Sequence, residues 1–278
     1  MSLLQSIQKP DDRPIICTIC GDAGTGKTRL AATFPKPIFI RAEDGMQSIP
    51  ADERPDAFPL LTRNAKASDS VAQLFDQLIA LLKEDHDYRT LVIDSVSALD
   101  AIFTAEALER DGRAKTLAQA LGGYGAGVQY VSDQHRRVRK ACGALNERKG
   151  MNVVFIAHAD VETMRLPDQE DYQRYSLRLP AKSLPPYVDD VDLVGFIKLT
   201  SIVRGEDGER KRVSSNGDRE LVVASSAANV SKNRFGITDV LDVPEGSNPL
   251  LGLVPGLPKT PEPNAATKTE TKQKEEAK

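Results

Sequence analysis

Residues 15–28 read Ile15-Ile16-Cys17-Thr18-Ile19-Cys20-Gly21-Asp22-Ala23-Gly24-Thr25-Gly26-Lys27-Thr28, and this stretch decides the fold. Its first six residues are an unbroken run dominated by apolar side chains, which predicts a buried strand. Its last eight residues fit the pattern G-x-x-x-x-G-K-[ST], and a short helix is expected to follow from Thr28 to Phe34. Glycines let a backbone wrap phosphates closely, and amide groups at the start of a helix face an anion. Residues 21–28 are therefore predicted to bind the phosphates of ATP.

Three side chains have expected roles around those phosphates. Lys27 is expected to reach the β- and γ-phosphates, and the Thr28 hydroxyl is expected to ligate Mg²⁺. Asp94 ends the apolar run Thr90-Leu91-Val92-Ile93-Asp94, and a carboxylate at that point holds Mg²⁺ directly or through water in P-loop proteins. The alternative for Asp94 is an ordinary turn residue at a strand end. ATP and Mg²⁺ are thus the expected ligands.

Two more residues are candidates for the chemistry of hydrolysis. Glu43 lies just past an apolar run at 38–40, where a carboxylate could act as general base toward the water that attacks the γ-phosphate. Asp44 is the competing carboxylate. His158 ends another apolar run and could donate a hydrogen bond toward a γ-phosphate, although a lone histidine at a strand end is often structural.

Strand and helix patterns alternate along the chain, which predicts an α/β fold with a mostly parallel sheet covered by helices on both faces. The last strands are expected to extend the sheet as an antiparallel edge, with a hairpin turn at 204–212. Residues 1–14 are predicted to be a short arm, 15–256 an ATPase core and 257–278 a disordered tail. The expected strands are 15–20, 38–40, 90–94, 152–157, 193–203 and 220–225, and the expected helices are 28–34, 68–83, 97–110 and 128–148.

Two segments are predicted to be loops. The glycine cluster at 122–127 should be mobile. Residues 159–188 are polar, contain prolines and lack clear periodicity. This segment is long for a structureless connection in a compact domain. Loops of that length are usually functional or disordered.

The composition sets limits on the class of protein. Charged residues make up 28% of the 278 residues and the formal net charge is -3, so a nucleic-acid site would have to be a local patch. No apolar run approaches the roughly 20 residues of a membrane span, so a cytoplasmic protein without a membrane partner is expected. Cys17 and Cys20 form a C-x-x-C inside the first strand, where residues three apart face opposite sides and would not share a metal.

Four spaced motifs resemble the RecA-like class of P-loop ATPases. The stretch 91–99 is similar to the Mg²⁺-binding strand of RecA-type recombinases, and 39–43 is similar to the segment with their catalytic glutamate. Residues 154–158 match the strand that ends in their γ-phosphate sensor, although RecA has glutamine where this chain has His158. Lys232-Asn233-Arg234 resembles the paired basic residues that reach the ATP of a neighbouring subunit, and Phe235-Gly236 is similar to related ring helicases.

The resemblance runs in order across residues 15–240 and implies a RecA-like core that hydrolyses ATP at subunit interfaces of a homo-oligomer. Within that class the chain is close to a bare core. In this respect it looks like phage-encoded RecA-like ATPases, which work in single-strand annealing beside a single-strand binding protein. In that case the location would be the host cytoplasm. No carboxylate stands close to Lys232 and Arg234 in sequence, so both are expected to reach outward. The alternative is a solvated basic turn or an intramolecular salt bridge.

In the family, two loops bind single-stranded DNA, and they correspond to 122–127 and part of 159–188. Tyr124 among glycines offers a ring on which a base can stack. Acidic neighbours oppose the basic residues of the second loop, so a solvated loop of mixed charge is the alternative there. The basic run 136–140 on the long helix is expected to be a solvated face. The basic candidates for phosphate contacts in the second loop are Arg165, Arg174, Arg178 and Lys182.

Three functions remain open from the sequence. The first is an ATPase that assembles on single-stranded DNA and promotes annealing or strand exchange. The second is a hexameric ring motor that unwinds DNA, and the third is a nucleotide-switched module that loads a partner with little turnover. DNA-stimulated ATPase activity separates the first two from the third, and unwinding of a forked duplex separates the second from the first.

Overall fold

The computed structural model describes residues 7, 12–204 and 212–259. These residues form one mixed sheet with the strand order β10-β8-β7-β1-β5-β4-β2-β3, while β6 pairs with β5 and β9 with β7. The strands are β1 (Ile16–Gly21), β2 (Pro37–Arg41), β3 (Asp56–Ala57), β4 (Thr90–Asp94), β5 (Asn152–Met164), β6 (Tyr172–Leu177), β7 (Leu193–Arg204), β8 (Arg212–Val222), β9 (Lys232–Asn233) and β10 (Val240–Asp242). The predicted α/β class with a mostly parallel sheet is confirmed.

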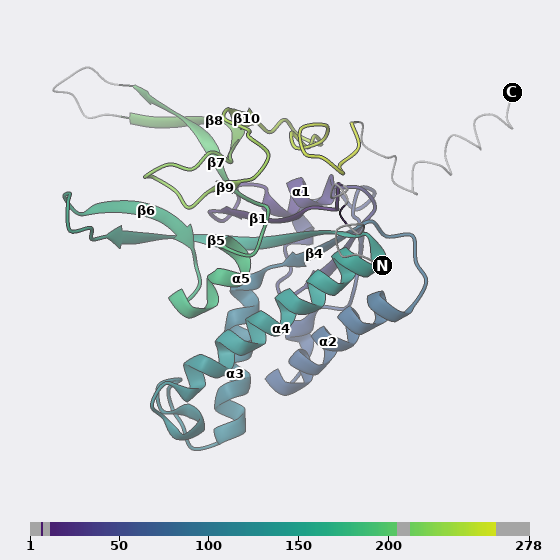
Figure 1. Cartoon of the computed structure of the whole chain (residues 1–278), viewed down its shortest axis with the longest axis vertical. Helices are drawn as coiled ribbons and strands as arrows, with labels where there is room; N and C mark the ends of the chain where they lie inside the picture. Colours follow the sequence, from purple (N-terminus) through teal and green to yellow (C-terminus); the bar gives the residue numbers. More distant parts are fainter. Residues whose placement is uncertain (1–6, 8–11, 205–211, 260–278) are drawn as a thin grey trace, which may run out of the picture.

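Helices cover both faces of this sheet (Figure 1). Helices α2 (Ala67–Lys83), α3 (Val96–Asp111) and α4 (Ala126–Lys149) lie together on one face, and α1 (Lys27–Ala32) lies on the other with the segment that follows β10. The helix α5 (Pro185–Val188) precedes β7. Short 3-10 turns η2 (Met46–Ser48), η3 (Leu61–Arg63), η4 (Ala120–Gly122) and η5 (Ala181–Ser183) complete the described elements.

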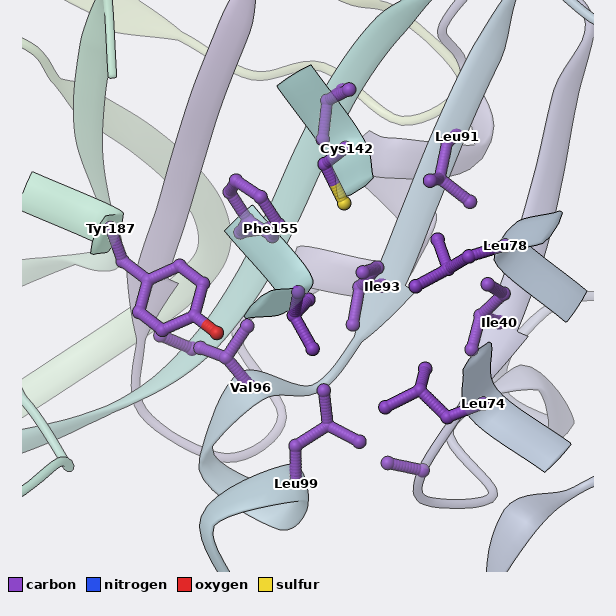
Figure 2. Packing of buried hydrophobic residues seen from close by; sticks show 14 of the residues in the cluster. Ile40, Leu74, Leu78, Leu91, Ile93, Val96, Leu99, Cys142, Phe155 and Tyr187 are labelled. Carbon is purple, nitrogen blue, oxygen red and sulfur yellow. The ribbon is translucent and has the colours of Figure 1, made fainter. Parts of the chain in front are cut away.

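The larger core lies between the sheet and helices α2 to α4. Figure 2 shows Leu74 and Leu78 of α2 facing Ile40, Leu91 and Ile93 of the sheet. These side chains are buried, and removing that much apolar surface from water is the main favourable term in folding. The helix periodicity of 68–83 arises because one stripe of α2 faces this core.

The C-x-x-C pair behaves as expected for an ordinary buried strand. Cys17 packs in the α1 layer and Cys20 packs in the layer of α2 to α4, so the two thiols lie on opposite faces of β1. Burial raises the pKa of the Cys20 thiol to about 12, which keeps it protonated at neutral pH. The prediction that the two side chains face opposite sides of the strand is confirmed.

The structure corrects three expectations about connectivity. Strand β7 runs parallel to β1 beside it and is not an antiparallel edge, whereas β8 and β10 are antiparallel. Residues 159–188 are not a structureless loop, because β5 continues to Met164 and pairs antiparallel with β6. Strand β8 already begins at Arg212, eight residues before the expected start. The predicted hairpin turn at 204–212 lies largely outside the described residues, although its two strands are paired.

Both predicted boundaries are crossed by contacts. Arg13, in the expected arm, forms an ion pair with Asp192. Leu257, the first residue of the expected tail, is buried against the α1 layer. Pro258 and Lys259 are also described, whereas residues 260–278 of that tail lie outside the described part of the chain. Among the described residues, no helix combines the length and apolar character needed to cross a membrane.

Candidate active site

The carboxyl ends of three neighbouring parallel strands bring the predicted site residues together. Gly21 at the end of β1 is level with His158 in β5, and Asp94 at the end of β4 is level with Ile156. The segment after β2 hydrogen-bonds to the same point, since the backbone amides of Ala42 and Glu43 both donate to the Asp94 carbonyl. Ligands of open α/β sheets bind at this edge. An open cleft of about 370 Å³ lies there, and Lys27, Thr28, Glu43, Asp94 and His158 all line it.

The Lys27 ammonium group lies inside its own loop. Its Nζ donates hydrogen bonds to the carbonyl oxygens of Gly21, at 3.0 Å, and Asp22, at 2.8 Å. Burial lowers the pKa of Lys27, and neighbouring carboxylates oppose that shift. An anionic phosphate is a stronger partner for this cation than two neutral carbonyls. The loop therefore holds a cation in place for a phosphate chain.

The Thr28 hydroxyl and the Asp94 carboxylate form the candidate Mg²⁺ site. Thr28 Oγ1 donates to Asp94 Oδ2 at 2.9 Å. Gly45 faces both oxygens, and a Cβ there would lie 2.9 Å from Asp94 Oδ2 and 3.0 Å from Thr28 Oγ1. Only a residue without a side chain leaves that space open. Burial, with the charge of Glu43, raises the pKa of Asp94 to about 6.

These residues fit Mg²⁺. The ion prefers hard oxygen ligands and keeps several waters, so one carboxylate, one hydroxyl and adjoining open space match its needs. A bound dication would also offset the unfavourable burial of the Asp94 charge. Thr28 and Asp94 are therefore the residues that would hold the metal, and Gly45 keeps the site accessible.

Glu43 faces His158 across the cleft. His158 Nε2 lies 2.9 Å from Glu43 Oε1, and the His158 backbone amide donates to Ser97 Oγ at 3.0 Å. Burial alone would raise the pKa of Glu43, but hydrogen bonds from His158 and Ser95 outweigh it and hold the pKa below its usual value. Glu43 is thus kept as an ionised carboxylate, the form that a general base requires.

Asp44, the competing carboxylate, also lines the cleft but turns toward a different partner. Its Oδ1 lies 3.4 Å from Arg41 Nη1. Glu43 therefore has the better geometry for a role at the γ-phosphate, because it is grouped with Lys27 and His158. The catalytic role of Glu43 stays a prediction.

The candidate DNA residues belong to several elements: Tyr124 precedes α4, and the basic candidates lie in or after the β5–β6 hairpin. Tyr124 is fully exposed on the turn between η4 and α4. Arg174 forms an ion pair with Glu162 across the β5–β6 hairpin at 2.6 Å, and Arg165 forms one with Asp171 at 3.4 Å. Both guanidinium groups are therefore paired with carboxylates. This arrangement fits the alternative of a solvated segment of mixed charge. Arg178 lines a second groove, about 680 Å³ in volume, beside α3.

Lys182 lies at the base of the same hairpin, in η5. Its backbone carbonyl accepts a hydrogen bond from Ser132 Oγ of α4 at 2.7 Å, which fixes the main chain at this point. The Lys182 side chain is exposed. A phosphate contact by Lys182 remains a prediction.

Lys232 and Arg234 lie near the amino ends of β1 and β7, whereas residues 21–28 follow the carboxyl end of β1. Arg234 Nη1 lies 3.1 Å from Asp192 Oδ1, and Asp192 also accepts from the Ile16 amide at the start of β1. Lys232 donates to the carbonyl oxygens of Val188 and Asp189. The expectation that both reach outward without a partner is therefore wrong, because the carboxylate that pairs with Arg234 lies 42 residues away in sequence.

Sequence reasoning missed Arg219 of β8, which lines the same cleft as Lys27. A Cβ at Gly26 would lie only 2.9 Å from Arg219 Nε, so the guanidinium group packs directly on the P-loop. The available signal was the alternation Arg219-Leu221-Val223, which places a charge on the core-facing side of a strand. Reading this signal requires the bounds of β8, and the expected strand at 220–225 begins one residue after Arg219.

Two comparisons with known proteins show what this chain is similar to. A family model described as an AAA domain matches residues 13–235. An uncharacterised protein derived from the SPbeta prophage of Bacillus subtilis (strain 168), YorG, is 22% identical over 233 residues. The match covers 81% of this chain and 60% of that relative, so this chain corresponds to only part of the relative's length.

Proposed function

Because the chain belongs to the AAA-domain family, a family of P-loop ATPases, we propose that it hydrolyses ATP in a cycle coupled to single-stranded DNA. The observation that carries the ATPase part is the Glu43–His158 pair facing Lys27 across one cleft. It places an ionised carboxylate within the same pocket as the phosphate-binding lysine. A module that only bound nucleotide would not need such a carboxylate.

The chemistry follows from the positions of these side chains. Glu43 accepts a proton from a water molecule while the water oxygen forms a bond to the γ-phosphorus. The bond from the γ-phosphorus to the bridging oxygen breaks, which gives ADP and phosphate. Lys27 balances the negative charge on the phosphates, and Thr28 and Asp94 would hold a Mg²⁺ ion that would supply further charge neutralisation. His158 orients the carboxylate through its hydrogen bond.

The DNA part of the proposal is supported by the turn that carries Tyr124. Five consecutive residues, 121–125, have positive φ, and two of them are the non-glycine residues Leu121 (57°) and Tyr124 (51°). Positive φ is unfavourable for a tyrosine and persists where surrounding structure enforces it. The result is an aromatic ring held out in solvent, which suits stacking on an unpaired base.

The biological setting is inferred from the prophage relative and the resemblance to phage recombination ATPases. In this proposal the protein acts in single-strand annealing or strand exchange, as a homo-oligomer in the host cytoplasm. A single-strand binding protein is the expected partner. Electron microscopy with single-stranded DNA and a non-hydrolysable ATP analogue tests the assembly, since it distinguishes a filament, a ring and a monomer.

Phosphate release with and without single-stranded DNA tests the function itself. We expect ATP hydrolysis that DNA stimulates, and Lys27→Ala should abolish both nucleotide binding and turnover because the phosphates lose their main cationic partner. Near-normal nucleotide affinity in a folded Lys27→Ala protein would exclude the P-loop assignment. Turnover that ignores DNA would favour the loader alternative, and unwinding of a forked duplex would favour the ring motor.

The role of Tyr124 has its own matched pair of variants. Tyr124→Ala should weaken single-stranded DNA binding by about 1–3 kcal/mol, whereas Tyr124→Phe keeps the ring and should bind nearly as well. Fluorescence anisotropy with a labelled oligonucleotide measures both. Equal binding by wild type and Tyr124→Ala would remove this loop from the DNA interface.

A further inference from the structure

At the end of strand β8, the charged residue Arg219 is followed on the same face by two apolar residues, Leu221 and Val223. Leu221 and Val223 are fully buried and pack in the α1 layer. Arg219 is the preceding residue on the same face, because side chains two apart on a strand point the same way. Its side chain therefore points toward the layer of α1 and the P-loop, and not toward solvent on the other face.

The guanidinium group of Arg219 packs against Gly26. The position of a Cβ on Gly26 would be 2.9 Å from Arg219 Nε and 3.3 Å from Arg219 Cδ. Nε is out of contact with water, and no hydrogen-bond acceptor for it exists among the described residues. A buried N–H of a charged group without an acceptor is costly, so such groups normally have a partner. The rest of the side chain lines the open nucleotide cleft.

The strand order shows which end of a bound nucleotide Arg219 would meet. The residues for the γ-phosphate and Mg²⁺ come from β5, β4 and the end of β2, which all lie on one side of β1. Strand β8 lies on the other side of β1, beyond β7. Arg219 thus approaches the P-loop from the flank opposite to Asp94 and Glu43.

We propose that Arg219 binds the nucleotide itself, through the α- and β-phosphates on the side of the cleft away from Mg²⁺. This inference rests on the proposed ATPase function and names a further residue of the same site. A guanidinium group matches phosphate oxygens well because its N–H groups form a planar fork. Phosphate oxygens of a nucleotide in this cleft would supply hydrogen-bond acceptors to the guanidinium group.

This position has a kinetic consequence. ATP and ADP share the α- and β-phosphates, so Arg219 stabilises the substrate, the transition state and the product to a similar extent. Such uniform binding lowers KM and leaves kcat unchanged. An arginine that contacted the transferred γ-phosphate would instead change kcat.

The test compares Arg219→Gln with Lys198→Met in the full chain. Lys198 carries the same charge on the adjacent strand β7, but it pairs with Glu220 and does not line the cleft. Titration calorimetry with Mg·ADP and with the non-hydrolysable analogue Mg·AMP-PNP measures affinity, and steady-state phosphate release measures kcat and KM. We expect Arg219→Gln to weaken both ligands by about tenfold to a hundredfold with kcat retained. Lys198→Met should match wild type.

Other outcomes overturn the inference in distinguishable ways. Unchanged affinity for both ligands in Arg219→Gln would show that the side chain only packs on Gly26. Loss of AMP-PNP affinity or kcat with normal ADP affinity would move its role to the γ-phosphate. Both results leave the ATPase proposal intact, whereas a wild-type protein that binds neither ligand would remove both. If Arg219→Gln does not fold, Arg219→Lys keeps charge and bulk and should weaken both ligands equally but less.

Discussion

His158 Nε2 lies within hydrogen-bonding distance of both oxygens of the Glu43 carboxylate, 2.9 Å from Oε1 and 3.1 Å from Oε2. The contact joins residues 115 positions apart in sequence, one after β2 and one in β5. It fixes the carboxylate in the cleft and favours its ionised form. The first two predictions follow from this pair.

Glu43→Gln should separate binding from hydrolysis. The amide keeps the size of the side chain but cannot accept the proton from water, so turnover should fall by roughly a hundredfold or more. ATP affinity should stay close to that of wild type. Phosphate release and equilibrium binding measure the two properties. Asp44→Asn is the matched control and should remain active, and the reverse pattern would make Asp44 the general base.

His158→Ala should change the pH dependence of turnover. Hydrogen bonds from His158 help to hold the pKa of Glu43 below its usual value, against burial. A base works only while ionised, so a raised pKa for Glu43 means that activity is lost at a higher pH on acidification. The acid limb of the kcat/KM profile should therefore move to higher pH. His86→Ala controls for loss of a histidine outside the cleft, and an unmoved acid limb in His158→Ala would contradict the prediction.

Gly45→Ala should weaken the Mg²⁺ site. The added methyl group would lie 2.9 Å from Asp94 Oδ2 and 3.0 Å from Thr28 Oγ1, so one of these oxygens must shift. Changes next to metal ligands typically cost tenfold to a hundredfold in metal affinity, and the Mg²⁺ concentration for half-maximal turnover should rise by about tenfold. Gly143→Ala is the control, because that methyl group would meet only the end of the Arg139 side chain. An unchanged Mg²⁺ requirement in Gly45→Ala would argue against a metal at Thr28 and Asp94.

Arg234 could either complete a neighbour's site or only neutralise Asp192. A variant of Arg13, which pairs with the same carboxylate, distinguishes the two roles. Both guanidinium groups pair with Asp192 Oδ1, at 3.1 Å and 2.6 Å, and both are about half exposed. If Arg234 completes a neighbour's site as an arginine finger, Arg234→Ala should lower DNA-stimulated turnover by about 10³-fold or more while Arg13→Ala stays active. Similar mild effects of both variants would mean that Arg234 only neutralises Asp192.

Mixing experiments test the same residue between subunits. If Arg234 completes a neighbour's site, Arg234→Ala and Glu43→Gln are each strongly impaired, but a mixed assembly contains some interfaces with an intact Glu43 and an intact Arg234. Part of the activity should return on mixing. Absence of recovery in mixtures that co-assemble would exclude composite sites.

Local patterns in the sequence predicted the buried parallel strands and the motifs beside them. The apolar runs that became β1, β4 and the first half of β5 are buried on both sides, so their composition alone identified them. The P-loop residues 21–28 and Asp94 were found for the same reason, because each adjoins such a run. Their grouping around one cleft followed from the parallel pairing of the strands.

The missed features depend on partners that the residue pattern does not identify. The β5–β6 hairpin is held by cross-strand pairs such as Arg174 with Glu162, and its mixed polar composition gives no strand signal before the partner strand is known. The ion pair of Arg234 needs Asp192, which lies before β7. Arg219 is 193 positions from Gly26 in the numbering of the chain, and only the pairing of β8 with β7 brings them together.

Strand β5 crosses from the core into the β5–β6 hairpin without a break. It enters the sheet at Asn152, contributes His158 beside Glu43, and continues to Met164. At about 3.3 Å per residue, the outer end lies roughly 20 Å beyond His158. The strand is paired with β1 up to His158 and with β6 beyond it, so no unpaired segment separates its outer end from the histidine. A displacement of the hairpin would therefore be transmitted through His158 to the Glu43 carboxylate, which we propose as the general base.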